Sequence, residues 1–443
     1  MLSVPARGRM DWTLVLAASA LIVVGTIALL SAASHIPGYH GILQRHSLAL
    51  AIGIGLFLFG FSFHYQIYQD QSRILYALTL AMMVVVLLMG TVRRGHRAWF
   101  EFSIISFQPM ELARIGVVLA LASFLDWRGR RIGELSTVGG ALALVGTVMV
   151  LILLQPDFAS SLTFFPVLIG MLFCAGASFE HLVVLVGYGS IAIAFPLVYV
   201  LCQVHFPDAA SGTVAKIVME TGRLGWTTAA VLVGVAAVAA GCWWLALMMR
   251  LRPRAGYFIV AAAIVVTGLL SGIMVNRQLK GYQRNRFVAF LSPETDIQGA
   301  SYNVHQSVIA IGSGGLLGKG LFSGTQSRLG FLPERHTDFI FAVIGEEMGF
   351  IGTMGVLGLY MLMIWRLIET AKLSRDRYGS LVASGLASML AFHLMLNVGM
   401  CLGVVPVAGV PLPLVSYGGS SLAVTMWALG IATNIHSHRY SFL

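Results

Sequence analysis

Long continuous apolar runs separated by short polar breaks dominate the pattern of this 443-residue chain. A helix that crosses the bilayer needs roughly 20 mostly apolar residues. Strands are disfavoured, because transmembrane strands alternate apolar and polar positions whereas these runs are continuous. The pattern therefore predicts an all-α, polytopic membrane helical bundle of about twelve transmembrane helices in a single membrane domain, 1–443. The predicted spans are 12–34, 47–65, 74–92, 104–125, 138–154, 158–176, 181–203, 225–249, 256–276, 338–365, 380–404 and 414–435.

Composition excludes a soluble globular protein, because 58% of the residues are hydrophobic and only 10% are charged, against about 25% charged in an ordinary soluble domain. The 28 Lys and Arg outnumber the 18 Asp and Glu and give a net charge of +10. These basic residues are scattered between apolar runs instead of sharing one soluble face, so no nucleic-acid partner is predicted. The four cysteines lie in apolar runs without paired spacing, and neither a disulfide framework nor a metal motif is expected.

The distribution of Lys and Arg among short loops predicts the orientation of the chain. The segment 277–337 is long and basic, and a loop of that length counts little in this rule. Once it is set aside, inner segments hold more than twice as many Lys and Arg as outer segments if both termini are cytoplasmic. We therefore expect 277–337 to be one large extracytoplasmic loop. Its charge suits a phosphate or pyrophosphate headgroup, or equally a general contact with anionic lipid.

Ionisable residues inside predicted spans require a reason, because charge in hydrocarbon is costly. Glu111 and Arg114 lie three residues apart and share one helical face, which allows an ion pair. Gln108 and Pro109 precede them and add an amide and a helix irregularity, which favours a polar cavity. Both interpretations stay open.

Three carboxylates belong to the predicted span that begins at Asp338. Glu346 and Glu347 follow Asp338 by eight and nine residues, which places them roughly 12–13 Å along the helix and well into the membrane. Adjacent helical positions point about 100° apart, so at most one of the two glutamates easily faces a given cavity. Asp338 or Thr337 suits a helix cap, whereas a carboxylate at the outer membrane boundary suits a general base acting on a lipid-linked substrate.

Two breaks interrupt the apolar pattern at membrane depth, at 155–157 and 406–420. Irregular backbone at that depth is tolerated only where it is buried in protein or lines a water-filled cavity. We expect both breaks on the outer side, lining one cavity with the basic loop. The glycine-rich stretch 312–320 lacks the ending of a phosphate-binding loop and predicts no nucleotide site.

Four segments in this order along the chain resemble the SEDS family (shape, elongation, division and sporulation). Arg335 and the run 409–413 are similar to the rod-shape, or elongation, branch of that family, with the division and sporulation branches as alternatives. The four segments are FQPME at 107–111, QPD at 155–157, FLPERHTDFIF at 331–341 and PLPLVSYGGS at 411–420.

The resemblance implies a peptidoglycan glycosyltransferase of the bacterial inner membrane that polymerises lipid II on the extracytoplasmic side. Partners implied are a class B penicillin-binding protein and other membrane proteins of the elongation machinery. The essential aspartate of the family matches Asp338, which would act as the base of an inverting transfer, with cations stabilising the departing undecaprenyl pyrophosphate. Whether Mg²⁺ or Mn²⁺ assists stays open, and no metal ligands are predicted. The expected substrate-binding residues are Arg284, Arg286, Lys319, Arg335, His336 and Ser416, and the expected supporting residues are Gln108, Glu111, Arg114, Asp157, Glu346 and Glu347.

The predicted span count exceeds the ten that the resemblance implies. The surplus falls at 204–255, which we interpret as an insertion with one or two extra spans, either a partner contact or a neutral elaboration. Two other functions stay open. A lipid II flippase would use the intramembrane charges for transport, although no internal repeat is evident. A non-catalytic scaffold for the penicillin-binding protein would not need Asp338 as a base.

Overall fold

Helices make up most of the computed structural model, which describes residues 10–34, 39–93, 96–102, 105–206, 213–250, 255–292, 299–328 and 330–439. Contacts divide the chain into two units. The first comprises Met1–Ala177 and Asn303–Leu443, and the second comprises Ser178–Tyr302.

The first unit contains all of the strands within the described residues. Helix α14, Ala300–Ser313, begins at the boundary between the units. The other elements are α1 (Trp12–Ala33), α2 (Tyr39–Ser62), α3 (Tyr65–Asp70), α4 (Ser72–Met89), β1 (Thr91–Arg93), β2 (His96–Phe102), β3 (Ile105–Phe107), α5 (Pro109–Arg128), the 3-10 helix η1 (Gly129–Gly133), α6 (Leu135–Leu154), α7 (Phe158–Leu162), α8 (Phe164–Ala175), α15 (Thr325–Arg328), α16 (Ile340–Leu373), α17 (Arg377–Cys401) and α18 (Gly419–Ser437).

Ten helices in the described residues are long and apolar enough to cross a membrane, fewer than the twelve predicted. The predicted spans 104–125 and 414–435 correspond to α5 and α18, which form but are not among the ten. Both helices are buried along most of their length. Their side chains therefore contact protein instead of lipid, and their sequences are accordingly more polar than those of lipid-facing spans. The ten are α1, α2, α4, α6, α7 with α8 (Phe158–Ala175), α9, α11, α12, α16 and α17.

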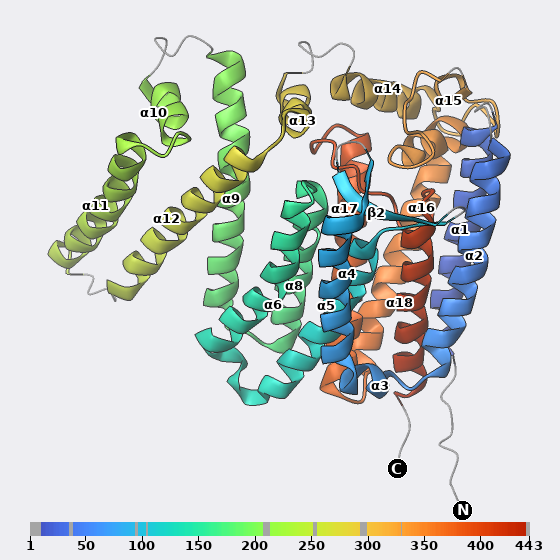
Figure 1. Cartoon of the computed structure of the whole chain (residues 1–443), viewed down its shortest axis with the longest axis horizontal. Helices are drawn as coiled ribbons and strands as arrows, with labels where there is room; N and C mark the ends of the chain where they lie inside the picture. Colours follow the sequence, from blue (N-terminus) through green and yellow to red (C-terminus); the bar gives the residue numbers. More distant parts are fainter. Residues whose placement is uncertain are drawn as a thin grey trace, which may run out of the picture. The chain divides into compact units, whose positions relative to one another are not determined.

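Helix packing in the first unit joins two pairs of helices that are far apart in the sequence and one consecutive pair. Helix α2 packs against α18, α1 against α16, and α16 against α17 (Figure 1). Gly430 allows the close approach of α18 to α2, because a Cβ there would lie 2.3 Å from the main-chain oxygen of Phe57. These pairings bring the segments 331–341 and 411–420 to the end of the bundle where α1 ends and α16 begins.

A three-stranded antiparallel sheet in the order β1-β2-β3 lies between α4 and α5 (Figure 1). Phe100 pairs with Phe107, and Glu101 with Ser106. The sequence pattern did not predict this sheet. The predicted spans 74–92 and 104–125 overran into it at their ends, and their helices stop at Met89 and start at Pro109.

The second unit is built around packing of α9 against α12. Phe195, Tyr199 and Ile273 form its buried core, and Tyr188 Oη lies 2.8 Å from Ser271 Oγ. The interpretation of 204–255 as an insertion stays a prediction. Its helices are α9 (Phe179–His205), α10 (Thr213–Thr221), α11 (Trp226–Met248), α12 (Ala255–Gln278) and α13 (Gly281–Leu291).

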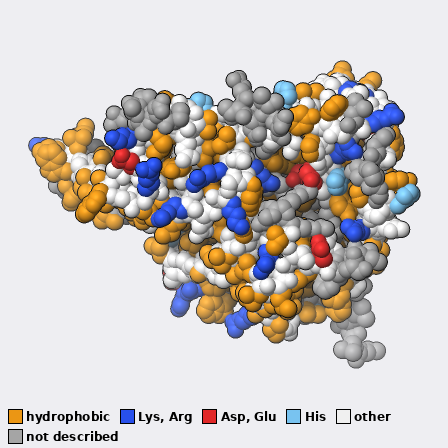
Figure 2. Space-filling model, turned by 45° about the horizontal axis from the view of Figure 1, so that its top comes forward, with side chains coloured by type: hydrophobic (Ala, Val, Ile, Leu, Met, Phe, Trp, Pro, Cys, Tyr) orange, Lys and Arg blue, Asp and Glu red, His pale blue; other side chains and the backbone are white. Residues whose placement is uncertain are grey.

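The predicted outer loop 277–337 contains α13, α14 and α15, none of which is a candidate span. On the face drawn in Figure 2, hydrophobic side chains are widely spread and Lys and Arg are scattered among them.

Candidate active site

A tight turn places Asp338 immediately before α16. The main-chain oxygen of Glu334 accepts hydrogen bonds from the amides of Thr337 and Asp338, both at 3.1 Å, and of Phe339 at 3.3 Å. Helix α16 begins at Ile340 with Phe339 in the cap position, so neither Thr337 nor Asp338 occupies that position. Asp338 is half-buried, whereas the residues that follow it are buried. The carboxylate therefore stands where an accessible turn meets the packed bundle.

Asn397 of α17 fixes the main chain at this turn. Its Nδ2 donates to the main-chain oxygens of Asp338 and Val410, each at 2.9 Å. Cys401, one helical turn further along α17, lies with its Sγ 3.8 Å from the same Asp338 oxygen. Asn397 is fully buried. Sequence reasoning missed it, although a lone amide inside an apolar span is the kind of signal that marks such a role.

The broken segment 411–420 closes on the same turn. The amide of Tyr417 donates to the main-chain oxygen of His336 at 2.9 Å, and the two rings lie 5.8 Å apart. The hydroxyl of Ser416, expected to bind substrate, accepts from the amide of Leu412 at 2.8 Å and is buried. Ser416 thus stabilises the loop, and Tyr417 and His336 join the two segments.

Arg335 binds the end of α1. Its Nε donates to the main-chain oxygen of Ala32 at 2.8 Å, and the side chain is only 7% exposed. Burial lowers the pKa of the Arg335 guanidinium from its ordinary value. Arg335 was expected to contact substrate. Its Nε instead satisfies a main-chain oxygen at the end of α1.

Glu346 holds the glycine-rich loop that precedes α15. Its Oε1 accepts from Lys319 Nζ at 2.9 Å, from Thr325 Oγ1 at 2.9 Å and from the amide of Gln326 at 2.8 Å. Glu346 is fully buried. Lys319, expected to bind substrate, also lies 2.7 Å from Thr325 Oγ1. The predicted cation and the predicted intramembrane carboxylate thus bind each other.

Glu347 binds the other side of the same loop. Its Oε1 accepts from Ser31 Oγ of α1 at 2.5 Å, and its Oε2 from the amide of Phe322 at 3.2 Å. Helix α16 is interrupted at Gly349, which has φ +65°, so the main-chain oxygens of Glu346 and Glu347 are available to the same loop. The amides of Lys319 and Gly320 donate to the main-chain oxygens of Glu346 and Glu347, respectively, both at 3.0 Å.

Glu111 and Arg114 form a buried ion pair on α5, 2.5 Å apart. This is the pairing that their spacing allowed. Gln108 is the cap residue of α5, with Pro109 in its first turn. The pair borders a small cavity that His393 of α17 also lines.

Asp157 caps the short helix α7. Its Oδ1 accepts from the amide of Ser160 at 3.1 Å, and its Oδ2 from Ser160 Oγ at 2.7 Å. Both contacts are local, and they shape the break at 155–157.

Arg284 and Arg286 lie on α13 in the second unit. Arg284 Nη2 donates to the main-chain oxygen of Asn276 at 3.3 Å, and its guanidinium lies 6.0 Å from the ring centroid of Tyr199. The structure brings Lys319, Arg335, His336 and Ser416 into the first unit with Asp338, whereas Arg284 and Arg286 belong to the unit that is considered separately.

Within the part of the chain that the structure describes, no group of three or more His, Cys, Asp or Glu residues is placed to hold a metal ion.

The fold and the site define a polytopic membrane protein. Within its first unit, three segments meet at the main chain beside a half-buried aspartate: the turn before α16, the last turns of α17 and the loop before α18. The model of the FtsW/RodA/SpoVE family, described as cell cycle protein, matches residues 9–209 and 227–441. The chain belongs to this family, the SEDS family.

Two relatives and one solved structure that are similar to this chain have names that refer to peptidoglycan synthesis. The chain is 34% identical over 374 residues to peptidoglycan glycosyltransferase MrdB of Escherichia coli K12, covering 84% of this chain and 80% of that protein. It is 30% identical over 435 residues to the probable peptidoglycan glycosyltransferase FtsW of Thiomicrospira cyclica, covering 96% and 91%. A chain from a solved structure on the coordination of polymerization and crosslinking by a peptidoglycan synthase complex matches with a TM-score of 0.67 and 29% identity, covering 98% of this chain and 99% of that one.

Proposed function

We propose that this protein is a peptidoglycan glycosyltransferase that polymerises lipid II, with Asp338 as the general base. The names of the relatives support the activity. The observation that carries the role of Asp338 is the convergence on its turn of Asn397 and of Tyr417, which bind the main chain at Asp338 and His336. Such anchoring of the main chain that carries a half-buried carboxylate suits an aligned proton acceptor.

The chemistry needs one base and one set of cations. A β-1,4 bond made from an α-linked sugar pyrophosphate forms by a single inverting displacement. The acceptor 4-hydroxyl oxygen bonds to the donor C1, the C1–pyrophosphate bond breaks, and Asp338 takes the hydroxyl proton. Undecaprenyl pyrophosphate leaves as a stable anion, so no second carboxylate has to protonate it, in contrast to glycoside hydrolysis.

Roles for the basic residues follow from their contacts. Lys319 and Arg335 bind protein groups, so we propose that they order the loop before α15 and the end of α1. We propose His336, which lies in the first unit with Asp338, as a ligand of the pyrophosphate. Arg284 and Arg286 of the second unit stay candidates predicted from the sequence. As a second role, we propose that Lys319 releases Glu346 and binds the substrate when the substrate is present.

Membrane placement is also proposed. Burial of α5 and α18 supports counting them as spans beside the ten apolar helices, which restores twelve. The active site then lies on the extracytoplasmic side, with both termini cytoplasmic.

A class B penicillin-binding protein is the proposed partner, and the match to a chain of a peptidoglycan synthase complex supports it. Arg335 and the run 409–413 favour elongation over division, and we propose that 204–255 is an elaboration of this lineage.

Purified protein in vesicles containing fluorescent lipid II tests the activity, with and without a class B penicillin-binding protein. Glycan chains in the presence of protein, resolved by gel electrophoresis, are the expected result. Accessibility of lipid II to an external probe is measured in the same vesicles. Movement of lipid II across the membrane without glycan would replace the polymerase by a flippase. Neither product nor movement, with the partner still bound, would favour a scaffold.

A further inference from the structure

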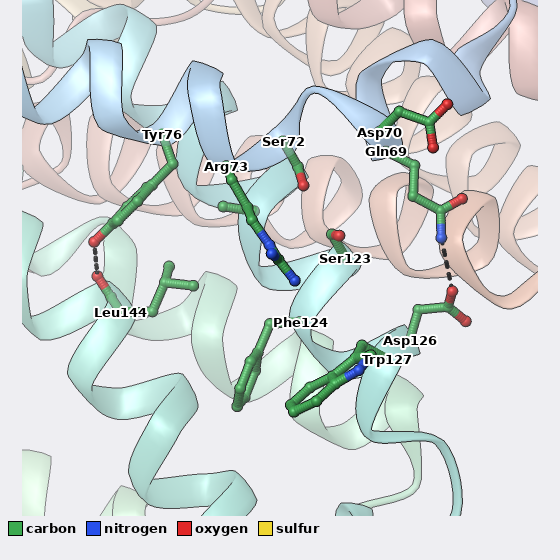
Figure 3. Close-up of a pocket in the computed structure, with 11 residues that line it drawn as sticks. Gln69, Asp70, Ser72, Arg73, Tyr76, Ser123, Phe124, Asp126, Trp127 and Leu144 are labelled. Carbon is green, nitrogen blue, oxygen red and sulfur yellow. Dashed lines mark hydrogen bonds between the residues drawn. The ribbon is translucent and has the colours of Figure 1, made fainter.

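A pocket of about 680 Å³ with both polar and apolar walls (Figure 3) lies in the first unit, at the end where α1 begins and α18 ends (Figure 1). Its walls are the end of α3, the first turns of α4, the last turns of α5 and one residue of α6. Helix α3 is fixed to α18 by a hydrogen bond from the amide of Tyr65 to Asn434 Oδ1, 3.0 Å long. Asp338 stands at the other end of the bundle. The volume is that of a small-molecule site.

One part of the pocket offers unused donors. Ser72 is only 2% exposed, its hydroxyl points into the pocket (Figure 3), and it makes no hydrogen bond to the described residues. The guanidinium of Arg73 extends above the rings of Phe124 and Trp127 (Figure 3) and likewise binds none of the described residues. Both residues belong to the first turn of α4, whose cap residue Gln71 makes no side-chain cap bond. A hydroxyl, a guanidinium and helix-terminal amides together suit a phosphate.

A second part of the pocket is acidic. Asp70 and Asp126 lie on one side, with Gln69 between them (Figure 3). Gln69 Nε2 donates to Asp126 Oδ2 at 2.8 Å, which fixes that carboxylate. Two carboxylates repel a purely anionic ligand and attract a cation. The pocket therefore presents a phosphate site and an ammonium site side by side.

The remaining wall is apolar and lies at a membrane boundary. Tyr76 donates its hydroxyl to the main-chain oxygen of Leu144 at 2.7 Å and so turns its ring to the pocket. Helices α4 and α6 are both candidate spans, so the first turn of α4 marks an end of the membrane-crossing segment. Trp127 is 72% exposed, with the Arg128 guanidinium 5.4 Å from its ring centroid. An exposed Trp beside Arg is typical of headgroup depth.

We propose that this pocket binds the phosphoethanolamine headgroup of a membrane phospholipid. The phosphate binds Ser72 and Arg73, the ammonium binds Asp70 and Asp126, and the acyl chains leave along the apolar wall. A phosphoglycerol headgroup has no ammonium for the two carboxylates. A phosphocholine headgroup has the charge but no N–H to donate. The site is separate from the proposed active site.

Native mass spectrometry of the full-length protein in detergent tests the assignment, with phosphatidylethanolamine, phosphatidylglycerol and phosphatidylcholine of identical acyl chains as probes. We expect several-fold more retained phosphatidylethanolamine than either other lipid. Arg73→Gln lowers its retention about tenfold, as loss of a charge-assisted bond predicts, and Ser72→Ala lowers it less. Asp126→Asn brings phosphatidylethanolamine down to the phosphatidylcholine level.

Arg130→Gln is the matched control, because Arg130 is an exposed arginine of the neighbouring η1 outside the pocket. It should retain lipid as the wild type does, and melting temperatures identify any variant that has lost its fold. Equal loss in Arg73→Gln and Arg130→Gln, or equal retention of phosphatidylethanolamine and phosphatidylcholine by the wild type, overturns the proposal. Displacement of the lipid by equimolar soluble glycerophosphoethanolamine would assign the pocket to a free phosphate ester instead.

Discussion

Asn397 Nδ2 lies 2.9 Å from the main-chain oxygen of Asp338 and 2.9 Å from that of Val410. One buried amide group thus joins the turn that carries the proposed base to the broken segment before α18. Neither carbonyl lies in a regular helix, so a side chain in the packed bundle must satisfy both. The position of Asp338 depends on a residue of another helix, 59 positions away.

Replacement of Asn397 by Leu should impair both folding and activity. The substitution keeps approximate volume but leaves the buried Val410 oxygen without its donor, at about 1–3 kcal/mol, and leaves the Asp338 oxygen only the weak Cys401 contact. We expect a lower melting temperature and a loss of glycan synthesis beyond the loss of folded protein. Asn434→Leu is the matched control, since Asn434 donates to the main-chain oxygen of Phe61 at 2.6 Å near the opposite end of α18. Equal activity per folded protein in the two variants would refute a positioning role for Asn397.

Glu346 and Lys319 should behave as one energetic unit. Glu346→Ala removes the acceptor of the Thr325 hydroxyl and of the Gln326 amide and leaves the Lys319 ammonium only Thr325 Oγ1, at a cost of up to about 3–5 kcal/mol. Lys319→Met should cost less, because Lys319 is 26% exposed. A double-mutant cycle from melting curves should give a coupling above about 0.5 kcal/mol. Additive effects would mean that the contact does not order this loop.

Substitution of Arg335 distinguishes a structural role of this residue from direct binding of the substrate. Arg335→Gln removes the bond to the Ala32 oxygen, so we expect a lower melting temperature with kcat for lipid II reduced and KM little changed. A cation that bound pyrophosphate directly would raise KM instead. Steady-state kinetics on folded protein distinguishes the two results, and a raised KM with unchanged melting would contradict the assignment made from the Ala32 contact.

Acidification should weaken the α2–α3 corner. Burial, and then the neighbouring His438, lower the pKa of His64 from its ordinary 6.5. His64 Nδ1 accepts from the amide of Gln66 at 3.3 Å, which a protonated ring cannot do. Because the unfolded chain takes up this proton first, stability is present above pH 6.5 and is lost as the pH falls through the folded pKa.

The measurement is the melting temperature between about pH 7.5 and about pH 5. His64→Asn keeps a cap acceptor that does not titrate, so its melting temperature should fall less than that of the wild type. Identical falls would show that His64 contributes nothing to the acid sensitivity of this corner.

The sequence predicts the long helices, including the buried helices α5 and α18, but not the contacts between them. The ten apolar helices follow from run length alone, because lipid contact demands apolar residues on every exposed face. Helices α5 and α18 are packed inside the bundle, where their polar side chains contact other helices. The hydrophobic pattern of the sequence does not identify those helices. The three-residue strands β1 and β3 are too short to leave an alternating pattern.

Among the site residues, a local contact is predictable from the sequence and the long-range contacts are not. The local pairing of Glu111 with Arg114 follows from their spacing. By contrast, nothing in the sequence connects Glu347 to Ser31, 316 residues away, or Asn397 to Asp338. Long-range contacts of this kind arise from helix packing. In the sequence, a polar residue inside an apolar run indicates that such a contact exists but not which residue is the partner.

Asp338→Asn tests the central proposal most directly. Asparagine keeps the size of the side chain and the main-chain contact to Asn397 but cannot take a proton from the acceptor hydroxyl. Glu134→Gln, an exposed carboxylate of the first unit, is the charge-matched control. With fluorescent lipid II and a class B penicillin-binding partner, the account predicts wild-type glycan from the control and none from Asp338→Asn at equal melting temperature and equal lipid II binding. Glycan from Asp338→Asn at the wild-type rate would contradict it.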